Sequence, residues 1–201
     1  QYLGFTTIAQ IVLTSSVVGS FKTQGTHDFP LDLFWKHSFA VGMVAEITAR
    51  SLQLPNAQDA FICGLMHDMG KLILLEVMPD QLHQIVRHAK EHQMSFFAAE
   101  QALELVPHTQ LGVLLADHWK LPKSISACIH HHHDTFQDKP FSQDQVLIAW
   151  ANQWVHGQNI GHSGDYCPEH ELLEAELSQK ISLLIFYTHF NRLTAQLAVH
   201  K

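Results

Sequence analysis

The chain has 201 residues, of which 46% are hydrophobic and 15% charged, and this composition fits one compact folded domain and excludes a disordered chain. Its formal net charge of −7, counted with neutral His, and the lack of any Lys/Arg run exclude nucleic-acid binding as a main function. The 17 His side chains are unusual and make the net charge depend strongly on pH near neutrality.

For residues 2–52 the sequence predicts two helices joined by a loop. Residues 2–18 favour a helix because their apolar residues suit one helical face better than strict alternation, although the β-branched residues keep a strand open as the competing interpretation. Residues 19–30 are expected to form a loop. Asp32 is expected to cap a helix that continues to about Leu52.

A third helix leads into the most informative part of the chain. Asn56, followed three residues later by Asp59, resembles a capping arrangement, and the apolar residues after it carry the helix to His67. Gly70 is expected to allow the turn after this point. Residues 71–77 then predict a short helix.

Helices are also predicted along the rest of the chain, at residues 80–92, 95–107, 108–119, 122–133, 142–157 and 178–200, and Asp80 is expected to cap the first of them. Polar stretches at 134–140 and 157–168 are expected to be loops. The sequence holds no convincing strand and no internal repeat. The predicted fold class is therefore all-α.

Cysteine usage and hydropathy indicate a reducing compartment away from membranes. Cys63, Cys128 and Cys167 are odd in number and match no zinc-ribbon or disulfide spacing, so we expect buried free thiols. No apolar run approaches ~20 residues and no signal peptide is visible, so a cytoplasmic location is expected. Because Gln1 is not an initiator Met and the chain opens inside an apolar pattern, we also expect that upstream residues are missing.

The adjacent pair His67-Asp68 is the strongest candidate for chemistry. An imidazole nitrogen and a carboxylate oxygen are both metal ligands, and a helical bundle builds a metal site from one ligand on each of several helices. Adjacent helical side chains point ~100° apart, so both can reach one ion only where the helix ends or bends. Alternatively, Asp68 bridges two ions, or the pair is only a hydrogen bond at a helix end.

Other histidines are ambiguous when taken alone. His37 lies near an apolar helix face, where a hydrogen-bonded core residue is more common than a ligand. His108 follows a proline, and an exposed residue at a helix start is the competing interpretation. The run from His130 to His133 fans around a helix axis, so at most one or two of its side chains face a core site. The sequence shows no Walker loop, no Gly-x-Ser-x-Gly elbow and no Cys-x-x-Cys motif.

Six short segments together resemble a known family: Trp35–Ser38, Gly64–Leu72, His108–Gly112, Trp119–Pro122, His132–Asp134 and Ala149–Asn152. In this order and spacing the chain resembles the HDOD domain, a branch of the HD superfamily of metal-dependent phosphohydrolases that is found in bacterial signalling proteins. The resemblance covers about residues 3–160. It implies an HD-superfamily helical bundle and a single domain over residues 1–201, with a loop and C-terminal helices over 161–201 and without the family's usual further N-terminal segment.

The resemblance also implies a ligand set, carried over position by position: His37, His67, Asp68, His108, His132, His133 and Asn152. In HD enzymes the first His, the His-Asp pair and a late Asp hold a metal, but the late position here is Asn152. The three remaining histidines match ligands for a second ion in the related HD-GYP branch. The Gly-Tyr-Pro signature of that branch is missing, so a cyclic di-GMP phosphodiesterase of that type is not expected.

The amide at position 152 favours one metal ion over two. An amide oxygen is neutral and a poorer ligand than a carboxylate, so it cannot balance the charge of two divalent ions. One divalent ion is therefore expected, and His/carboxylate ligation is compatible with Fe, Mn, Zn, Ni or Co.

Two functions follow from the resemblance. The first is a regulatory signal-transduction module whose partner is a signalling protein or a small phosphorylated ligand, with no nucleic-acid or membrane partner. The alternative is a metal-dependent phosphohydrolase acting on a nucleotide or another phosphoester, in which Asp68 and Lys71 are the catalytic residues and Lys71 neutralises phosphate charge. A His-rich metal-storage protein is a third hypothesis, supported by composition alone. The sequence leaves the oligomeric state open.

Overall fold

The computed structural model describes residues 19, 25–54, 57–134 and 142–167. Eight helices are labelled within these ranges, and no strand occurs in them: α2 (Leu31–Ser51), α3 (Ala57–Met66), α4 (Met69–Val77), α5 (Pro79–His92), α6 (Phe96–Ala102), α7 (His108–His118), α8 (Lys123–His131) and α9 (Gln143–Gly157). The all-α prediction is confirmed. The predictions for residues 2–18 and 178–200, the cap at Asn56 and most of the 134–140 loop lie outside the described residues.

Two helices, α6 and α9, begin at the serine where the sequence predicts their start, whereas α2 and α5 begin before the aspartate expected to cap them. Ser95 and Ser142 are N-caps, and Ser142 forms a complete capping box with Gln145. Asp32 and Asp80 lie inside the first turns of α2 and α5, where their negative charge favours the helix dipole, and are not the caps. The reason is that proline steers both starts: Pro30 is the N-cap of α2, and Pro79 occupies the first turn of α5.

The predicted helix 95–107 is shorter than expected. Helix α6 ends at Ala102, and Glu104 adopts a positive φ of 54°. The left-handed conformation of Glu104 ends the helix, and Pro107 further disfavours the helical conformation in Val106, the residue that precedes it.

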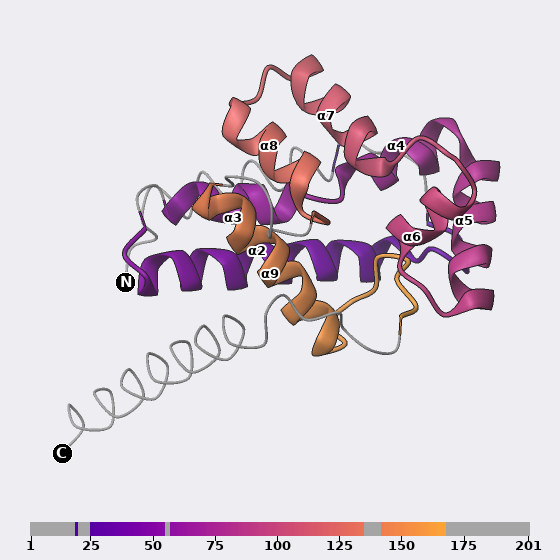
Figure 1. Cartoon of the computed structure of the whole chain (residues 1–201), viewed down its shortest axis with the longest axis horizontal. Coiled ribbons are helices and arrows are strands. Elements are labelled where there is room, and N and C mark those ends of the chain that lie inside the picture. Colours follow the sequence, from indigo (N-terminus) through magenta and orange to yellow (C-terminus); the bar gives the residue numbers. More distant parts are fainter. Residues whose placement is uncertain (1–18, 20–24, 55–56, 135–141, 168–201) are drawn as a thin grey trace.

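The long helix α2 runs through the bundle along the horizontal direction of Figure 1. It packs against α3 and α9, while α4 packs on α7 and α7 on α8. The crossing of α2 and α3 is very close, because a Cβ added at Gly64 would lie 2.6 Å from the Cα of Gly42. This approach brings the start of α2 and the end of α3 into one core, where Phe34, Met66 and Trp150 are among the buried side chains.

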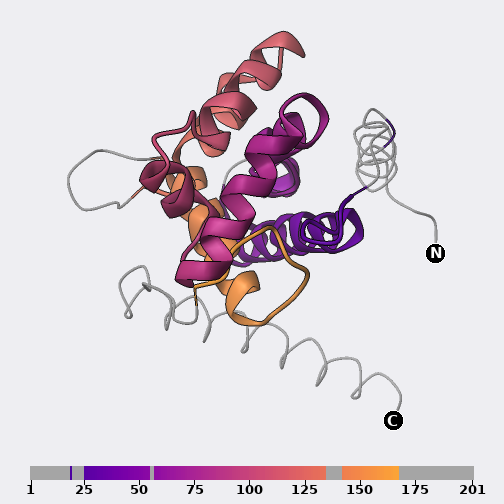
Figure 2. The same ribbon diagram turned by 90° about the vertical axis from the view of Figure 1, so that its right-hand side faces the viewer.

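The loop after α9 binds two parts of the bundle (Figure 2). The amide of His162 donates to the carbonyl of Leu33 in α2 at 3.0 Å, and the amide of Tyr166 donates to the carbonyl of Met94, just after α5, at 3.0 Å. This loop carries Ser163 and Asp165 into the interior, which has consequences for the site described below.

The cysteine prediction is confirmed for two of the three thiols. Cys63 and Cys128 are buried and free, and a hydrogen bond between them together with burial raises the pKa of Cys63. Cys167 is a thiol that is half-buried, with its Sγ 3.7 Å from Nε2 of His156. Among the residues that the structure describes, no helix combines the length and apolar character that crossing a bilayer requires.

Candidate metal centre

The structure brings all seven predicted ligand positions together from five places in the bundle. His37 lies on α2, His67 and Asp68 between α3 and α4, His108 at the first position of α7, His132 and His133 at the end of α8, and Asn152 on α9. Each of the first five residues in this set, through His132, is at most 1% exposed, Asn152 is 9% exposed, and His133 is half-buried. The exposed interpretation of His108 is therefore wrong.

The four histidines of the run differ in burial, because their side chains fan around the end of a helix. His130 is exposed and His131 is half-buried, whereas His132 and Nε2 of His133 are buried. The expectation that at most two of these four side chains face the core is confirmed.

The turn at the His-Asp pair is made by the pair itself and not by Gly70. His67 and Asp68 separate α3 from α4, and Asp68 is the N-cap of α4. Gly70 lies within α4, and a Cβ there would overlap the carbonyl oxygen of His108. Its role is thus the close approach of α4 to the first turn of α7, which places Asp68 beside His108.

The two oxygens of Asp68 face different sets of histidines. Oδ1 lies 3.2 Å from Nε2 of His108 and 3.4 Å from Nε2 of His132. Oδ2 lies 3.3 Å from Nε2 of His67. Two overlapping groups follow, in each of which the donor atoms lie within 4.8 Å of one another: Asp68, His108, His132 and His133 form one, and His37, His67 and Asp68 the other.

Oxygen acceptors orient three of the rings. The Nδ1–H of His67 donates to the carbonyl of Gly64 at 2.7 Å, and that of His132 donates to the carbonyl of Ile129 at 2.8 Å. The Nδ1–H of His108 donates to Glu100 at 2.8 Å. Since the proton is held on Nδ1, each ring directs Nε2 toward Asp68, which is the arrangement that metal-binding histidines require.

Asn152 is bound to His37. The Nε2–H of His37 donates to Oδ1 of Asn152 at 2.9 Å, in the interior of the bundle. The amide oxygen of Asn152 therefore accepts a hydrogen bond from a ligand candidate.

Lys71 is completely buried and its ammonium is surrounded by oxygen. It donates to Oδ2 of Asp68 at 2.9 Å and to the carbonyl of Ser163 at 3.0 Å, and it lies 3.5 Å from Oδ2 of Asp165. The ring of Phe96 lies on another side, with its centroid 4.8 Å from Nζ.

Sequence reasoning missed three residues of this site: Glu100, Ser163 and Asp165. Glu100 is 0% exposed and binds both the backbone N–H and Nδ1–H of His108. Asp165 accepts from the amide of Phe96 at 2.9 Å and from the hydroxyl of Ser163 at 2.7 Å. The polar residues of the 157–168 loop were the one signal available, and a loop residue facing inward cannot be told from a solvated one by pattern.

Charges around the centre lower the pKa of the Asp68 carboxyl group and raise the pKa of Lys71 and of His108. Burial opposes ionisation of Asp68, but His67, Lys71 and the adjacent rings of His108 and His132 hold its pKa well below the usual range. Burial alone would lower the pKa of Lys71, yet Asp165 and Asp68 raise it. Burial likewise opposes protonation of His108, and Glu100 with Asp68 overcomes this and raises its pKa to about 9.

The metal-free protein is expected to be most stable near pH 6.5. Burial lowers the pKa of His37 and of His132 to about 4, so below pH 6.5 the unfolded chain takes up protons that the folded chain refuses. Each of these two histidines should therefore remove about 2 kcal/mol of stability between pH 6.5 and pH 5. The raised pKa of His108 adds stability that is complete below pH 6.5 and is lost as pH rises through about 9.

Urea midpoints of chelator-treated protein at pH 5, 6.5 and 8 measure this profile. The decline toward pH 8 should disappear in His108→Gln, while the decline toward pH 5 should remain. An unchanged or higher midpoint at pH 5 would show that the histidines are not held neutral by burial.

A cavity of about 560 Å³ reaches the centre from outside. His132, His133, Asn152 and Asp165 lie in its wall, together with Phe97, whose ring is stacked on His133 at 4.7 Å. A small ligand in this cavity would therefore touch the centre at the end of α8.

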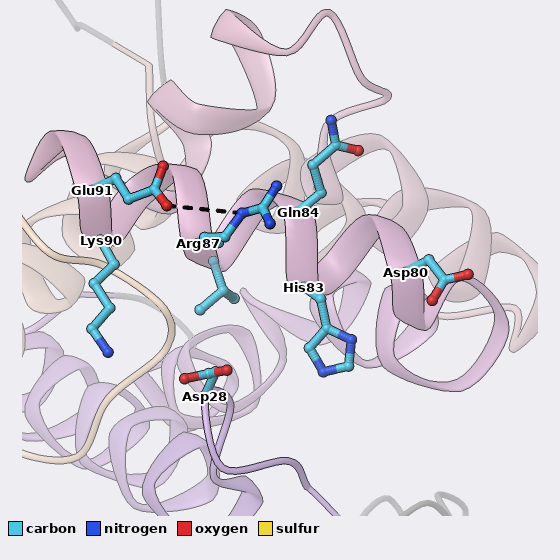
Figure 3. A pocket seen from close by; sticks show the side chains of 8 residues that line it. Asp28, Asp80, His83, Gln84, Arg87, Lys90 and Glu91 are labelled. Carbon is cyan, nitrogen blue, oxygen red and sulfur yellow. Dashed lines mark ion pairs between the residues drawn. The ribbon is translucent and has the colours of Figure 1, made fainter.

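A second cavity of about 720 Å³ lies along α5 and shares no lining residue with the first. Figure 3 shows its charged side chains, among them Arg87 and Lys90 as well as the carboxylates of Asp28, Asp80 and Glu91. Arg87 already faces Glu91 at 3.9 Å. Since both positively and negatively charged side chains line this cavity, its charge does not select for an anion or for a cation.

The described residues form an all-α bundle around a buried His/Asp cluster. The sequence model of the HDOD domain matches residues 1–135, more than half of the chain, and the chain belongs to the HDOD domain family. The predicted family and fold class are thereby confirmed.

Solved structures share this fold. An HDOD domain protein with unknown function from Geobacter sulfurreducens has a TM-score of 0.80 at 24% identity, covering 100% of this chain and 72% of its own. A "putative phosphohydrolase" from Shewanella amazonensis SB2B has a TM-score of 0.70 at 23% identity, covering 91% of this chain and 64% of its own. A "putative signal transduction protein" from Marinobacter aquaeolei VT8 has a TM-score of 0.72 at 18% identity, covering 92% of this chain and 43% of its own. At these identities the likeness concerns the fold alone.

A sequence relative is an uncharacterized protein of Treponema pallidum (strain Nichols), which is 24% identical over 141 residues. The match covers 69% of this chain and 27% of the relative, so the chain spans about a quarter of that protein.

Proposed function

We propose that this chain is a regulatory signal-transduction module whose buried His/Asp centre holds one divalent metal ion. The observation that supports a metal is a set of polar atoms without a hydrogen-bond partner in the interior: Oδ1 of Asp68, Nε2 of His67 and Nε2 of His133. A buried polar atom left unpaired is destabilising by about 1–3 kcal/mol. A bound cation would satisfy such atoms, and Oδ1 of Asp68 and Nε2 of His133 belong to residues of one ligand group. The residues present therefore fit the metal that the fold family implies.

The regulatory role is supported by the position of the centre, whose candidate ligands come from several helices of the bundle. One ion would join residues from α7, the end of α8 and the turn before α4, so its binding energy would act on the packing of several helices at once. Such a coupling between a ligand site and helix packing is what a module needs in order to signal to a protein partner. The two buried free thiols support a reducing compartment, and the proposal includes a cytoplasmic location.

A phosphohydrolase is the alternative, and the cavity beside His132 and His133 favours it. Its volume of about 560 Å³ suits a small phosphorylated ligand. A divalent ion at the centre would supply Lewis-acid polarisation of a phosphoryl oxygen. Lys71 is not among the cavity-lining residues, and its role toward phosphate stays a prediction.

Metal content per chain tests the proposal, measured after purification without a His tag or a nickel column. The wild type should hold about one ion, and His67→Ala/Asp68→Ala should hold none, because both groups of ligands lose Asp68. Asp68→Asn, which keeps the shape of the side chain, should give the same loss if the double variant folds poorly.

The matched control removes two exposed histidines, His118→Ala/His130→Ala. This variant should keep its ion, which separates the buried centre from adventitious binding by surface histidines. A wild type without stoichiometric metal, or metal retained in Asp68→Asn, would overturn the metal-holding proposal. Turnover of phosphoesters by the loaded wild type, abolished in Asp68→Asn, would replace the regulatory role with the alternative.

A further inference from the structure

We infer that the single ion binds between Oδ1 of Asp68 and the three histidines His108, His132 and His133, and that Lys71 closes the other position. This rests on the proposed metal-holding function and assigns the ion to one of two overlapping groups. The group that includes His37 and His67 would then be a preformed but blocked position.

The distances at the first position match the edges of a coordination tetrahedron. Ligand atoms about 2.1 Å from a tetrahedral ion lie about 3.4 Å from one another. Nε2 of His108 and Nε2 of His132 are 3.4 Å apart, and Oδ1 of Asp68 lies 3.2 Å and 3.4 Å from them. His133 completes the group, and its Nε2 has no other partner.

Two of the three residues at the other position already have hydrogen-bond partners on other side chains. Oδ2 of Asp68 accepts a hydrogen bond from Lys71 at 2.9 Å, and Nε2 of His37 is bound to Asn152 at 2.9 Å. Only Nε2 of His67 has no hydrogen-bond partner there. An ion at this position would have to displace an ammonium group and break the pairing of His37 before it gained its ligands.

Lys71 is held so that it cannot withdraw. Its side chain is 0% exposed, and its Nζ is fixed by the carbonyl and hydroxyl of Ser163 at 3.0 Å and 3.3 Å as well as by Asp165. Asp165 is itself anchored to the amide of Phe96 at the start of α6. The loop after α9 thus fixes a positive charge where a second metal ion would otherwise bind.

The charge balance agrees with a single ion. In the metal-bound centre the ligand histidines are neutral, so the three carboxylates of Asp68, Glu100 and Asp165 face the one positive charge of Lys71. One divalent ion neutralises this remainder of two negative charges. A second ion would leave two uncompensated positive charges in the interior, which is strongly unfavourable.

Paired variants titrated with Co²⁺ distinguish the two positions, with the stoichiometry and the visible absorption of the bound ion as readouts. His132→Gln should weaken Co²⁺ binding by at least about 100-fold, because a direct ligand is lost. His37→Gln should keep one ion with an unchanged absorption spectrum. Loss of the ion in His37→Gln with retention in His132→Gln would overturn the assignment.

Variants at the blocked position test the role of Lys71. Asn152→Asp alone should still bind one ion, since Lys71 continues to occupy Oδ2 of Asp68. Lys71→Met/Asn152→Asp should bind two, because the ammonium is gone and a third charged ligand is present. Two ions in the wild type or in Asn152→Asp, or one ion in the double variant, would show that Lys71 is not the barrier.

These outcomes differ from failure of the proposed function. A wild type that binds no Co²⁺ contradicts metal holding itself. One ion that depends on His37 contradicts only the choice of position.

Discussion

Asp68→Ala is expected to lower the free energy of unfolding by about 3–5 kcal/mol, measured by urea denaturation of the metal-free protein. The carboxylate lies 2.9 Å from Nζ of Lys71, and both side chains are at most 1% exposed. Its removal leaves a buried ammonium with Asp165 as its remaining charged partner and also removes the carboxylate oxygen that lies 3.2 Å from Nε2 of His108. The cost follows from the uncompensated charge and not from the volume of the lost atoms.

The chain provides a matched control in Asp117→Ala. Asp117 lies 2.8 Å from Nζ of Lys123, an almost identical distance, but the two side chains are 48% and 85% exposed. Water screens this pair, so its loss should change stability by less than about 1 kcal/mol. Equal effects of the two substitutions would contradict the view that burial determines the importance of Asp68.

Gly70→Ala is expected to prevent the native packing of α4 on α7, with a loss of at least about 3 kcal/mol or failure to fold. The new Cβ would overlap the carbonyl oxygen of His108 and lie 2.8 Å from the amide nitrogen of Gly112. Both contacts are with backbone, which cannot move aside without displacing His108 from Asp68. Metal binding should therefore be lost together with stability.

Gly112→Ala is the control at the same helix contact. Its Cβ would lie 2.6 Å from the γ2 methyl group of Ile129, which is a side-chain contact, and 3.3 Å from the nearest backbone atom, the amide nitrogen of Gly70. We expect a smaller loss, about 1–2 kcal/mol, with the metal retained. The melting temperature and the ion content of the two variants, compared directly, test whether backbone contact is the deciding factor. A Gly70→Ala variant as stable as Gly112→Ala would disprove the close approach.

The sequence alone predicted much of the centre because its ligands belong to local patterns. The His67-Asp68 pair, the histidine after Pro107 and the end of the His run are recognisable at fixed places relative to helix ends. The prediction that these residues form one site came from the family resemblance, and in the structure their side chains lie together. The caps at Ser95 and Ser142 were predictable for the same reason, since a cap is formed within four residues of chain.

The supporting residues could not be predicted in this way. Lys71 and Ser163 are 92 residues apart in the chain, and their contact exists only because the loop after α9 folds back over the start of α6. Glu100 lies on a different helix from His108, and nothing in its own segment marks it as buried. The role of Gly70 was misassigned because a glycine near a helix end fits a turn as well as a close contact with another helix.

The sequence by itself determined that the chain is helical and that it belongs to the HDOD class, and it predicted which side chains are candidate metal ligands. These properties depend on residue type and on spacing along a helix. The tertiary structure decided which oxygen of Asp68 faces which histidines, which donors already have partners, and where the charge of Lys71 is placed. The physical reason is that hydrogen bonds and charge compensation in a buried site depend on distances between helices, and no local pattern encodes those distances.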